Sequence, residues 1–410
     1  MQKAMAQDTQ YRIPLFSHHT RCRICDYGLP KPFFSLGRQT LANNLLHEPG
    51  EGATEVPLEI VRCESCGLVQ LSVVVDPRVL FDDYLYTPSQ NKSFHDHFEK
   101  LAIDVSVMYP NRTSGLWVDI GSNDGLLLGK AQDLGWMVTG IEPAERLAQQ
   151  ARENGIPTYC GYWGEAAAST LRATVISATN VFAHVDDLHT FVRLVKRSLV
   201  KDGVFIIEVP YLANMIHDGT FDLIYHEHLS YFSLKPLVRL FEQYDMYIAA
   251  VEQVKIHGGS IRLFVHHSPS SVVASLPSHW ADPPLPFDKF IDRAGRTKRK
   301  FIGAVHNYKY VIGYGAPAKA TVLINYCGLT NDDIRYIVDD NPLKQGKYLP
   351  GSNIPVISTE VQRIFEGRTE PDAVVIFPWN IANDIEPKVK QYFPGADIII
   401  PMPDVEVRGG

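Results

Sequence analysis

The sequence has no long apolar run and no excess of positive charge. No segment approaches the ~18 consecutive apolar residues that cross a bilayer, and residues 1–10 are polar instead of forming a basic stretch followed by an apolar one. We therefore expect no membrane span, no secretory signal and a cytoplasmic protein. With a net charge of −7 and a pI near 6.1, the chain is also too acidic overall to suggest nucleic acid as a partner.

Cysteine is scarce too, with six in 410 residues, but four of the six form two close pairs. The pairs are Cys22 with Cys25 and Cys63 with Cys66. In a chain without an export signal this pattern indicates metal binding, and two Cys-x-x-Cys turns supply the four thiolates that a tetrahedral zinc ion requires. No position is then left for water, so the sequence predicts a structural Zn²⁺. The alternatives are two unrelated thiol pairs or a redox pair, although neither pair sits at a strand-to-helix turn.

The length and the 45% of hydrophobic residues allow two or three domains with separate cores. The first block of sequence, to about residue 80, has little helical periodicity. Alternating strands and amphipathic helices follow, and a proline-rich stretch at residues 277–286 is a plausible linker. We expect a zinc-binding module at residues 11–80, a second domain at 81–270 and a C-terminal domain at 285–410.

The apolar pattern of the second and third blocks predicts an α/β fold. A parallel, helix-flanked sheet is expected from the strands Leu116–Ile120, Val138–Ile141, Val175–Ser177 and Val204–Val209. The next two strands are joined too closely for a crossover helix and should pair antiparallel, namely Met246–Val254 and Ser260–His267. A smaller α/β unit should contain a helix near Phe287–His306 and strands at Tyr310–Tyr314, Arg335–Val338, Ala373–Phe377 and Asp397–Ile400.

A glycine-rich turn, Asp119–Gly125, follows the first strand of the sheet and opens a helix at Leu126. Its Gly-x-x-x-Gly spacing departs from the dinucleotide pattern. About twenty residues on, Glu142 ends the second strand, where a carboxylate can accept hydrogen bonds from both hydroxyls of a ribose. This arrangement resembles class I S-adenosylmethionine-dependent methyltransferases, with a Rossmann-like sheet; a nicotinamide-binding fold or a turn without a ligand are the alternatives.

A histidine-rich segment, Tyr225–Ser233, offers two imidazoles, a carboxylate and two phenols close to the expected ligand-binding edge of the sheet. Such groups suit the removal of a proton before carbon methylation. If the segment is extended, His226 and His228 should face one way and Tyr225 and Glu227 the other. The alternatives are a hydrogen-bonded pocket wall or a metal site, but the spacing differs from that of the helical metalloprotease motif.

Taken together, these motifs resemble the zinc-containing sugar C-methyltransferases, such as the nucleotide-sugar 3-C-methyltransferases of deoxysugar pathways. The resemblance covers nearly the whole chain. Besides the cysteine pairs and the glycine turn, it rests on Tyr84–Tyr86, Asn180–Asp187, Glu208–Tyr211, Tyr225–His228 and Tyr314–Lys319.

The resemblance implies roles for individual residues. His228 is the implied base beside a 4-keto group, with Tyr225 and Glu227 shaping the site and Tyr84 or Tyr86 assisting. The implied S-adenosylmethionine site comprises Asp119, Gly121, Ser122, Asn123, Gly125, Glu142, Pro143, Asn180 and His184. The implied substrate contacts are Tyr225, His226, Lys319 beside a diphosphate, and Lys344 in the turn Asp339–Gly346, for which a solvated surface loop is the alternative.

The chain departs from the family pattern at two places, residues 87–93 and the pair Ala320 and Thr321. Both lie near the cofactor or substrate contacts that the resemblance implies. An O- or N-methyltransferase acting on a nucleotide sugar or another small-molecule intermediate therefore remains an alternative, as does a non-catalytic nucleotide-binding scaffold. The sequence leaves the oligomeric state open.

Overall fold

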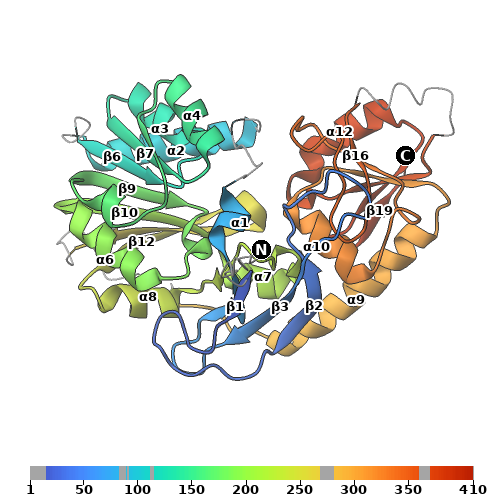
Figure 1. The fold of residues 1–410 in the computed structure, drawn as a ribbon, viewed down its shortest axis with the longest axis horizontal. Coiled ribbons are helices and arrows are strands. Elements are labelled where there is room, and N and C mark those ends of the chain that lie inside the picture. The colour runs from blue at the N-terminus through green and yellow to red at the C-terminus, as the bar shows by residue number, and fades with distance from the viewer. Residues whose placement is uncertain are drawn as a thin grey trace, which may run out of the picture.

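The computed structural model describes residues 15–82, 89, 92–110, 115–267, 281–359 and 370–409. Tyr84 and Tyr86, the two candidate assisting tyrosines, lie outside the described residues. Within the described part, an N-terminal β module lies between and below two larger α/β units (Figure 1).

The first α/β unit is built on a sheet with the strand order β12-β13-β10-β9-β6-β7-β8. The five strands β10, β9, β6, β7 and β8 run parallel to one another. Strand β13 pairs antiparallel with both β10 and β12. This confirms the expected parallel sheet with an antiparallel hairpin at one end. The strands are β6 (Leu116–Ile120), β7 (Met137–Glu142), β8 (Thr158–Cys160), β9 (Ala173–Thr179), β10 (Leu199–Pro210), β12 (Tyr247–Val254) and β13 (Ser260–His266).

Helices cover both faces of this sheet. Alternate strand residues point to opposite sides, and the apolar residues on each side are buried against helices. Trp117 packs against α2 (Lys92–Met108) and α3 (Leu126–Asp133) on one face, and Val118 packs against α6 (Leu188–Ser198) and α8 (Leu234–Glu242) on the other. The remaining helical elements are α4 (Glu145–Glu153), α5 (Glu165–Ala168), α7 (Leu212–Asp218) and the 3-10 turns η2 (Phe182–His184), η3 (Phe221–Leu223) and η4 (Ile256–Gly258).

The N-terminal module has a sheet of order β11-β4-β3-β2, whose outer strand comes from far along the chain. Three strands belong to the module, β2 (Phe34–Thr40), β3 (Glu55–Arg62) and β4 (Val69–Leu71), whereas β11 (Ser230–Tyr231) follows the histidine-rich segment. A second small sheet pairs β1 (Phe16–His18) with β5 (Val73–Val75), and α1 (Pro77–Phe81) ends the module. The module and the first α/β unit therefore share a sheet.

The C-terminal unit is the smaller α/β domain that the sequence predicted. Its sheet has the order β16-β15-β14-β17-β18-β19 and is parallel except for the last pair. The strands are β14 (Val311–Tyr314), β15 (Ile337–Val338), β16 (Val356–Ile357), β17 (Ala373–Ile376), β18 (Asp397–Ile400) and β19 (Glu406–Arg408); the helical elements are α9 (Phe287–His306), α10 (Ala318–Cys327), α12 (Ala382–Tyr392) and η5 (Trp379–Ile381). One apolar core joins β2 and β3 to α7, α9 and α10, so all three parts pack together.

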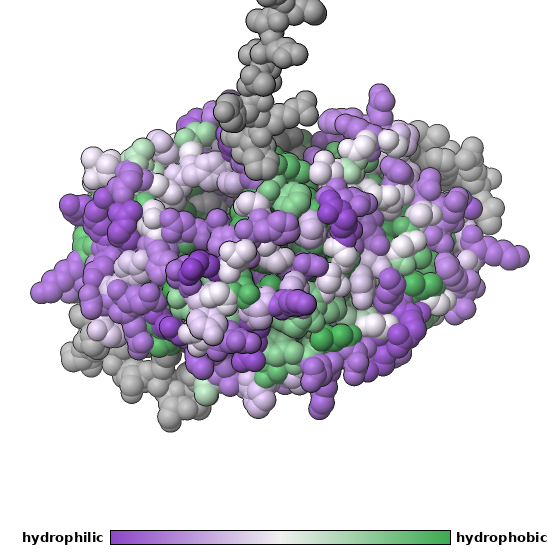
Figure 2. Space-filling view, turned by 60° about the horizontal axis from the view of Figure 1, so that its bottom comes forward, coloured by the Kyte–Doolittle hydropathy of each residue, from purple (hydrophilic) through white to green (hydrophobic). Residues whose placement is uncertain are grey.

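Hydrophilic residues spread over the face of the molecule shown in Figure 2, and apolar residues lie between them in small groups. Among the described helices, none is both long enough and apolar enough to cross a membrane.

Candidate active site

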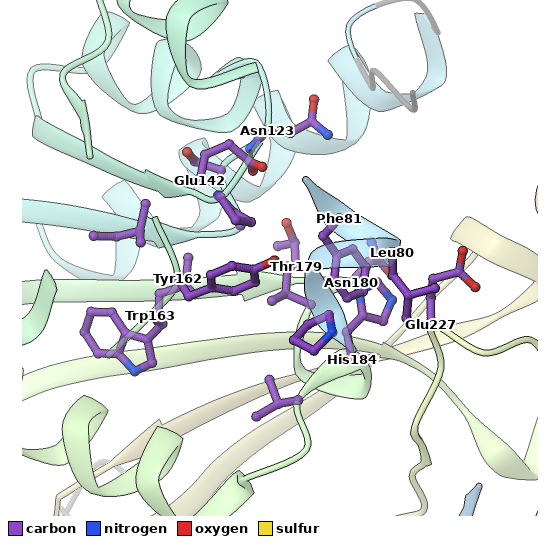
Figure 3. A pocket seen from close by; sticks show the side chains of 18 of the residues that line it. Leu80, Phe81, Asn123, Glu142, Tyr162, Trp163, Thr179, Asn180, His184 and Glu227 are labelled. Atoms are coloured by element: carbon purple, nitrogen blue, oxygen red, sulfur yellow. Dashed lines mark hydrogen bonds between the residues drawn. The ribbon is translucent and has the colours of Figure 1, made fainter. Parts of the chain in front are cut away.

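A cavity of about 340 Å³ opens at the carboxyl ends of the parallel strands. This volume is within the range of small-molecule sites, and the position is where open α/β sheets bind ligands. The wall combines the loops after β6, β7, β9 and β10 with residues of the N-terminal module, including Val74, Leu80 and Phe81. Figure 3 shows Glu142 and Asn123 at one end of the cavity and His184 and Glu227 at the other.

The glycine turn reaches the cavity through backbone conformations that L side chains seldom adopt. Gly121 has φ = 67°, and a Cβ atom there would lie 2.4 Å from Cγ2 of Val181. Gly125 (φ = 82°) begins α3 and does not line the cavity; its Cβ would lie 3.0 Å from Cγ1 of Ile156. Gly121 thus lets the backbone approach a ligand, while Gly125 lets α3 pack closely on its neighbours.

Glu142 holds the turn from the end of β7 and also lines the cavity. Its Oε2 accepts a hydrogen bond from the backbone of Asn123 at 2.8 Å, and its Oε1 accepts one from Ala144 at 2.9 Å. Burial raises the pKa of Glu142, and these two backbone donors oppose the rise. Each oxygen has a second lone pair, so the carboxylate can also accept hydrogen bonds from ligand hydroxyls.

Several buried polar atoms of the cavity wall have no hydrogen-bond partner among the described residues. They are both carboxylate oxygens of Asp124, Oγ of Ser122 and Oδ1 of Asn180, and all three residues line the cavity. Buried polar groups are normally paired, so these atoms fit a polar ligand with several donors. Asp124 was not among the predicted cofactor residues; its position within the glycine turn, directly before Gly125, was the available signal.

The other predicted cofactor residues also face this cavity. Asp119, Pro143 and His184 line it together with Asn123. Burial raises the pKa of Asp119 to about 7, while a hydrogen bond of 2.6 Å from Oγ of Ser177 favours the ionised form. Of the nine predicted cofactor residues, Gly125 is the one placed outside the cavity wall.

The opposite end of the cavity is formed by the start of the histidine-rich segment, Tyr225–His228, which is a turn and not an extended strand; the segment becomes a strand at β11. The amide of His228 donates to the carbonyl oxygen of Tyr225 at 3.0 Å, and His226 and Glu227 occupy the turn. The expected alternation of faces is therefore wrong. The reversal of the chain brings Tyr225, Glu227 and His228 to the cavity together, and His226 alone is turned away.

The tautomer of His228 follows from its hydrogen bonds. Nδ1 lies 2.9 Å from the carbonyl oxygen of Leu223, which can only accept, so Nδ1 carries the hydrogen. Nε2 is then the lone-pair nitrogen and accepts from the Tyr225 hydroxyl at 2.7 Å. Burial lowers the pKa of His228 to about 4, so the imidazole is a free base at neutral pH.

The side chains around His228 restrict its movement. Its ring stacks on His184 at 5.2 Å between centroids and lies 3.9 Å from the ring of Tyr225. Glu227 is buried, which raises its pKa, and its Oε1 accepts from Nδ2 of Asn43 at 2.8 Å. Asn43 belongs to the N-terminal module, and no local motif singles it out.

Three predicted substrate contacts lie outside the wall of this cavity. The Nε2 of His226 is 3.3 Å from the carbonyl oxygen of Val56 in β3, and burial lowers the pKa of His226 to about 4. Lys319, at the start of α10, donates to Asn380 and lies over the ring of Trp379. Lys344 donates to the carbonyl oxygen of Ala316 at 2.9 Å. The two lysines thus sit on the C-terminal unit.

The four paired cysteines come together in one cluster. All four sulfur atoms lie within 4.8 Å of one another, with 3.4 Å between Cys22 and Cys66 and 3.5 Å between Cys25 and Cys63. Zinc–sulfur bonds of about 2.3 Å in a tetrahedron place sulfurs roughly 3.8 Å apart, so the cluster fits Zn²⁺. The alternative of two unrelated pairs is wrong, and the four protein ligands fill a structural coordination sphere.

Family models match three successive segments of the chain. They describe a zinc binding domain at residues 22–81, a methyltransferase domain at residues 94–251 and a C-methyltransferase C-terminal domain at residues 255–403. The chain is also 35% identical over 408 residues to the C-methyltransferase NovU of Streptomyces niveus, and the match covers 94% of this chain and 96% of NovU.

Solved methyltransferases are similar to one part of the chain at low identity. The magnesium protoporphyrin IX methyltransferase of Synechocystis PCC 6803 with bound SAH is 12% identical with a TM-score of 0.36, covering 42% of this chain and 83% of that one. The CcbJ methyltransferase of Streptomyces caelestis is 14% identical with a TM-score of 0.34, covering 42% and 89%. The near full-length match to NovU and the order of the three domains decide the family: the chain belongs to the zinc-binding C-methyltransferases, which depend on S-adenosylmethionine.

Proposed function

We propose that this enzyme methylates a nucleotide-linked keto-deoxysugar at the carbon beside its carbonyl group, with His228 as the base. The observation that carries this proposal is the unprotonated Nε2 of His228 at the cavity end opposite Glu142. Methylation of an oxygen atom does not require a base that removes a proton from carbon, whereas methylation of the carbon beside a carbonyl group does.

The end with Glu142 suits the cofactor. The Glu142 carboxylate can accept from two ribose hydroxyls, and the buried Asp124 carboxylate offers a partner to a cationic group. When bound, S-adenosylmethionine supplies an electrophilic methyl group. The chain's contribution there is to orient the cofactor through Ser122, Asn180 and the backbone of the glycine turn.

The end with His228 suits proton removal. The carbonyl acidifies the neighbouring C–H, Nε2 of His228 takes that proton, and the electron pair of the broken C–H bond forms the new bond to the methyl carbon. The methyl–sulfur bond of the donor would break at the same time, and its electron pair would stay on the sulfur of S-adenosylhomocysteine. The bond from Nδ1 to Leu223 strengthens as the imidazole gains charge, because a charged donor bonds more strongly. The Tyr225 hydroxyl, now bonded to Nε2, must turn away and can donate to the substrate. Tyr84 and Tyr86 stay candidates for an assisting role.

The nucleotide is expected on the side of the C-terminal unit. Lys319 and Lys344 provide positive charge at the carboxyl edge of its sheet. Burial lowers the pKa of Lys319 to about 8, while the nearby Asp222 carboxylate favours its charged form. Lys344 lies 3.8 Å from Oδ2 of Asp339, so each lysine already has a carboxylate nearby, and a diphosphate would add acceptors to these paired cations.

A calorimetric titration tests the cofactor half of the proposal. Wild type and Glu142→Ala are titrated with S-adenosylhomocysteine, and wild type then with thymidine diphosphate and uridine diphosphate. We expect micromolar S-adenosylhomocysteine affinity that Glu142→Ala weakens by a factor of ten or more, and measurable affinity for one diphosphate. Cofactor affinity without diphosphate affinity would instead point to another small-molecule acceptor.

Deuterium exchange tests the base. A thymidine diphosphate-linked 4-keto-6-deoxyhexose is incubated in D₂O with the enzyme and no methyl donor, and deuterium beside the carbonyl is measured by mass spectrometry. We expect wash-in by wild type and its loss in His228→Gln. The absence of wash-in with both the thymidine- and uridine-linked sugars would favour the O- or N-methyltransferase alternative.

A further inference from the structure

The turn that carries His228 is attached to the N-terminal module at several points. The amide of Leu71 donates to the carbonyl oxygen of Leu229 at 3.0 Å, and β11 pairs with β4 directly afterwards. The preceding contacts of His226 with Val56 and of Glu227 with Asn43 involve the same module. The base therefore lies on a segment whose other side is bound to the module that holds the zinc site.

Arg23 connects the cysteine cluster directly to this segment. It lies inside the first Cys-x-x-Cys turn, and its side chain has no exposed surface. Its Nη1 donates to the carbonyl oxygens of Leu71 at 3.2 Å and of Leu229 at 3.3 Å. Its Nε donates to Oδ1 of Asp186 at 2.9 Å, and Asp186 lines the cavity. One guanidinium thus makes three contacts: with Leu71 in β4, with Leu229 directly after His228, and with Asp186 in the cavity wall.

Stability alone does not explain the buried contacts of Arg23. Burying a guanidinium is costly, and replacing a buried ion pair by apolar side chains is often neutral or stabilising. Nη2 of Arg23 is also buried without a hydrogen-bond partner among the described residues. What the planar, forked group supplies is geometry, since it binds two carbonyl oxygens and a carboxylate in fixed directions.

We propose that Arg23 is a positioning residue: it transmits the geometry of the zinc-bound turn to the His228 segment, so the zinc module is part of the scaffold of the active site. This inference rests on the proposed role of His228 as the base. A zinc ion bound by Cys22 and Cys25 would fix the backbone on both sides of Arg23 and hence the origin of its side chain. The contacts of Arg23 use two separate nitrogens, Nε and Nη1. A lysine carries all its donors on one nitrogen, so it cannot reproduce this spacing.

Two variants of Arg23 and a matched control test the proposal. Arg23→Met removes the contacts, and Arg23→Lys keeps the charge without the fork. The control is Arg21→Met, which alters an exposed arginine next to the same turn whose ion pair is with Asp26. For each protein, zinc content, S-adenosylhomocysteine affinity and the wash-in rate with the 4-keto-6-deoxyhexose substrate are measured.

We expect both Arg23 variants to keep zinc and cofactor affinity while the wash-in rate falls by about a hundredfold for Arg23→Met and less for Arg23→Lys. A misplacement of about 1 Å can have an effect of this size. Arg21→Met should match wild type. A wash-in rate for Arg23→Met within about twofold of wild type would overturn the proposal, and so would loss of zinc from both Arg23 variants, since Arg23 would then act on the metal site itself.

Two measurements need no substrate and separate this inference from the proposed function. Nitrogen NMR of the imidazoles reports the tautomer of His228, and hydrogen exchange reports the protection of the Leu71 amide that bonds to Leu229. We expect both to change in Arg23→Met and not in Arg21→Met. If wild type shows no wash-in, or His228→Gln retains it, the proposed function fails, and these two signals still decide whether Arg23 positions the segment; unchanged signals overturn the inference.

Discussion

Glu208 is the centre of a buried ionic network that fastens α2 to the sheet beneath the cavity. Its carboxylate, with no exposed side-chain surface, lies 2.8 Å from Nε2 of His97 on α2 and accepts from Nε of Arg262 at 2.6 Å. Arg262 also reaches the half-exposed Glu252 at 3.2 Å. The same helix supplies Phe94 to the cavity wall, so the network links the stability of the domain to the shape of the site.

The perturbation is Glu208→Gln, which keeps the shape and removes the charge. Arg262 is then left buried with the half-exposed Glu252 as its remaining carboxylate partner, beside its 3.3 Å contact with Nε2 of His97. Removing one member of a buried ion pair costs about 3–5 kcal/mol. For a domain of 150–250 residues, each kcal/mol lowers Tm by about 2–4 °C, so the melting temperature should fall by roughly 6–20 °C. Glu252→Gln, at the exposed end of the network, should cost about 0–1 kcal/mol.

The assay is scanning calorimetry at pH 7 on Glu208→Gln, Glu252→Gln and the double variant Glu208→Gln/Arg262→Met. The double variant should recover part of the loss, because it leaves no unpaired buried cation. A fall in Tm of less than about 2 °C for Glu208→Gln, or a double variant that melts no higher than the single one, would refute the reasoning.

The same network predicts the direction of a pH dependence. Burial alone would raise the pKa of Glu208, but His97 and Arg262 hold it below its ordinary value. The stabilisation is therefore complete above the unfolded-state pKa of about 4.3 and is lost as the pH falls through the lower folded-state pKa. The melting temperatures of wild type and Glu208→Gln should converge as the pH falls below about 4.

Three other changes are predicted to act at separate places. Cys63→Ser should abolish zinc binding in a metal analysis, because one of four thiolates is lost, whereas Cys160→Ser, outside the cluster, should retain the metal. Gly121→Ala should weaken S-adenosylhomocysteine binding at least tenfold in calorimetry, since its methyl group meets a valine side chain at 2.4 Å, while Gly129→Ala, with nothing within 4 Å, should not. Because burial lowers the pKa of His228 to about 4, the deuterium wash-in rate should stay constant down to about pH 5; an acid limb near 6.5 would contradict the free-base assignment.

The sequence by itself determined the features that depend on residues close together in the chain. Apolar runs and their spacing predicted the strands of both α/β sheets, and the short connection at Gly258 and Gly259 predicted the antiparallel pair. The doubled Cys-x-x-Cys pattern predicted the cluster for the same reason, because each turn places two thiolates by local geometry alone.

Only the tertiary structure decided which distant groups meet. The pairing of Ser230 with Gln70 and the contact of Arg23 with Leu229 join residues far apart in the chain, so no local pattern encodes them. The direction of the histidines is another example: an alternating pattern assumes an extended strand, whereas the turn at His226 rotates the following residues. The sequence predicted which types of side chain would form the site. That the cofactor residues and His228 line one cavity depends on chain reversals and on packing between modules, which the whole fold sets.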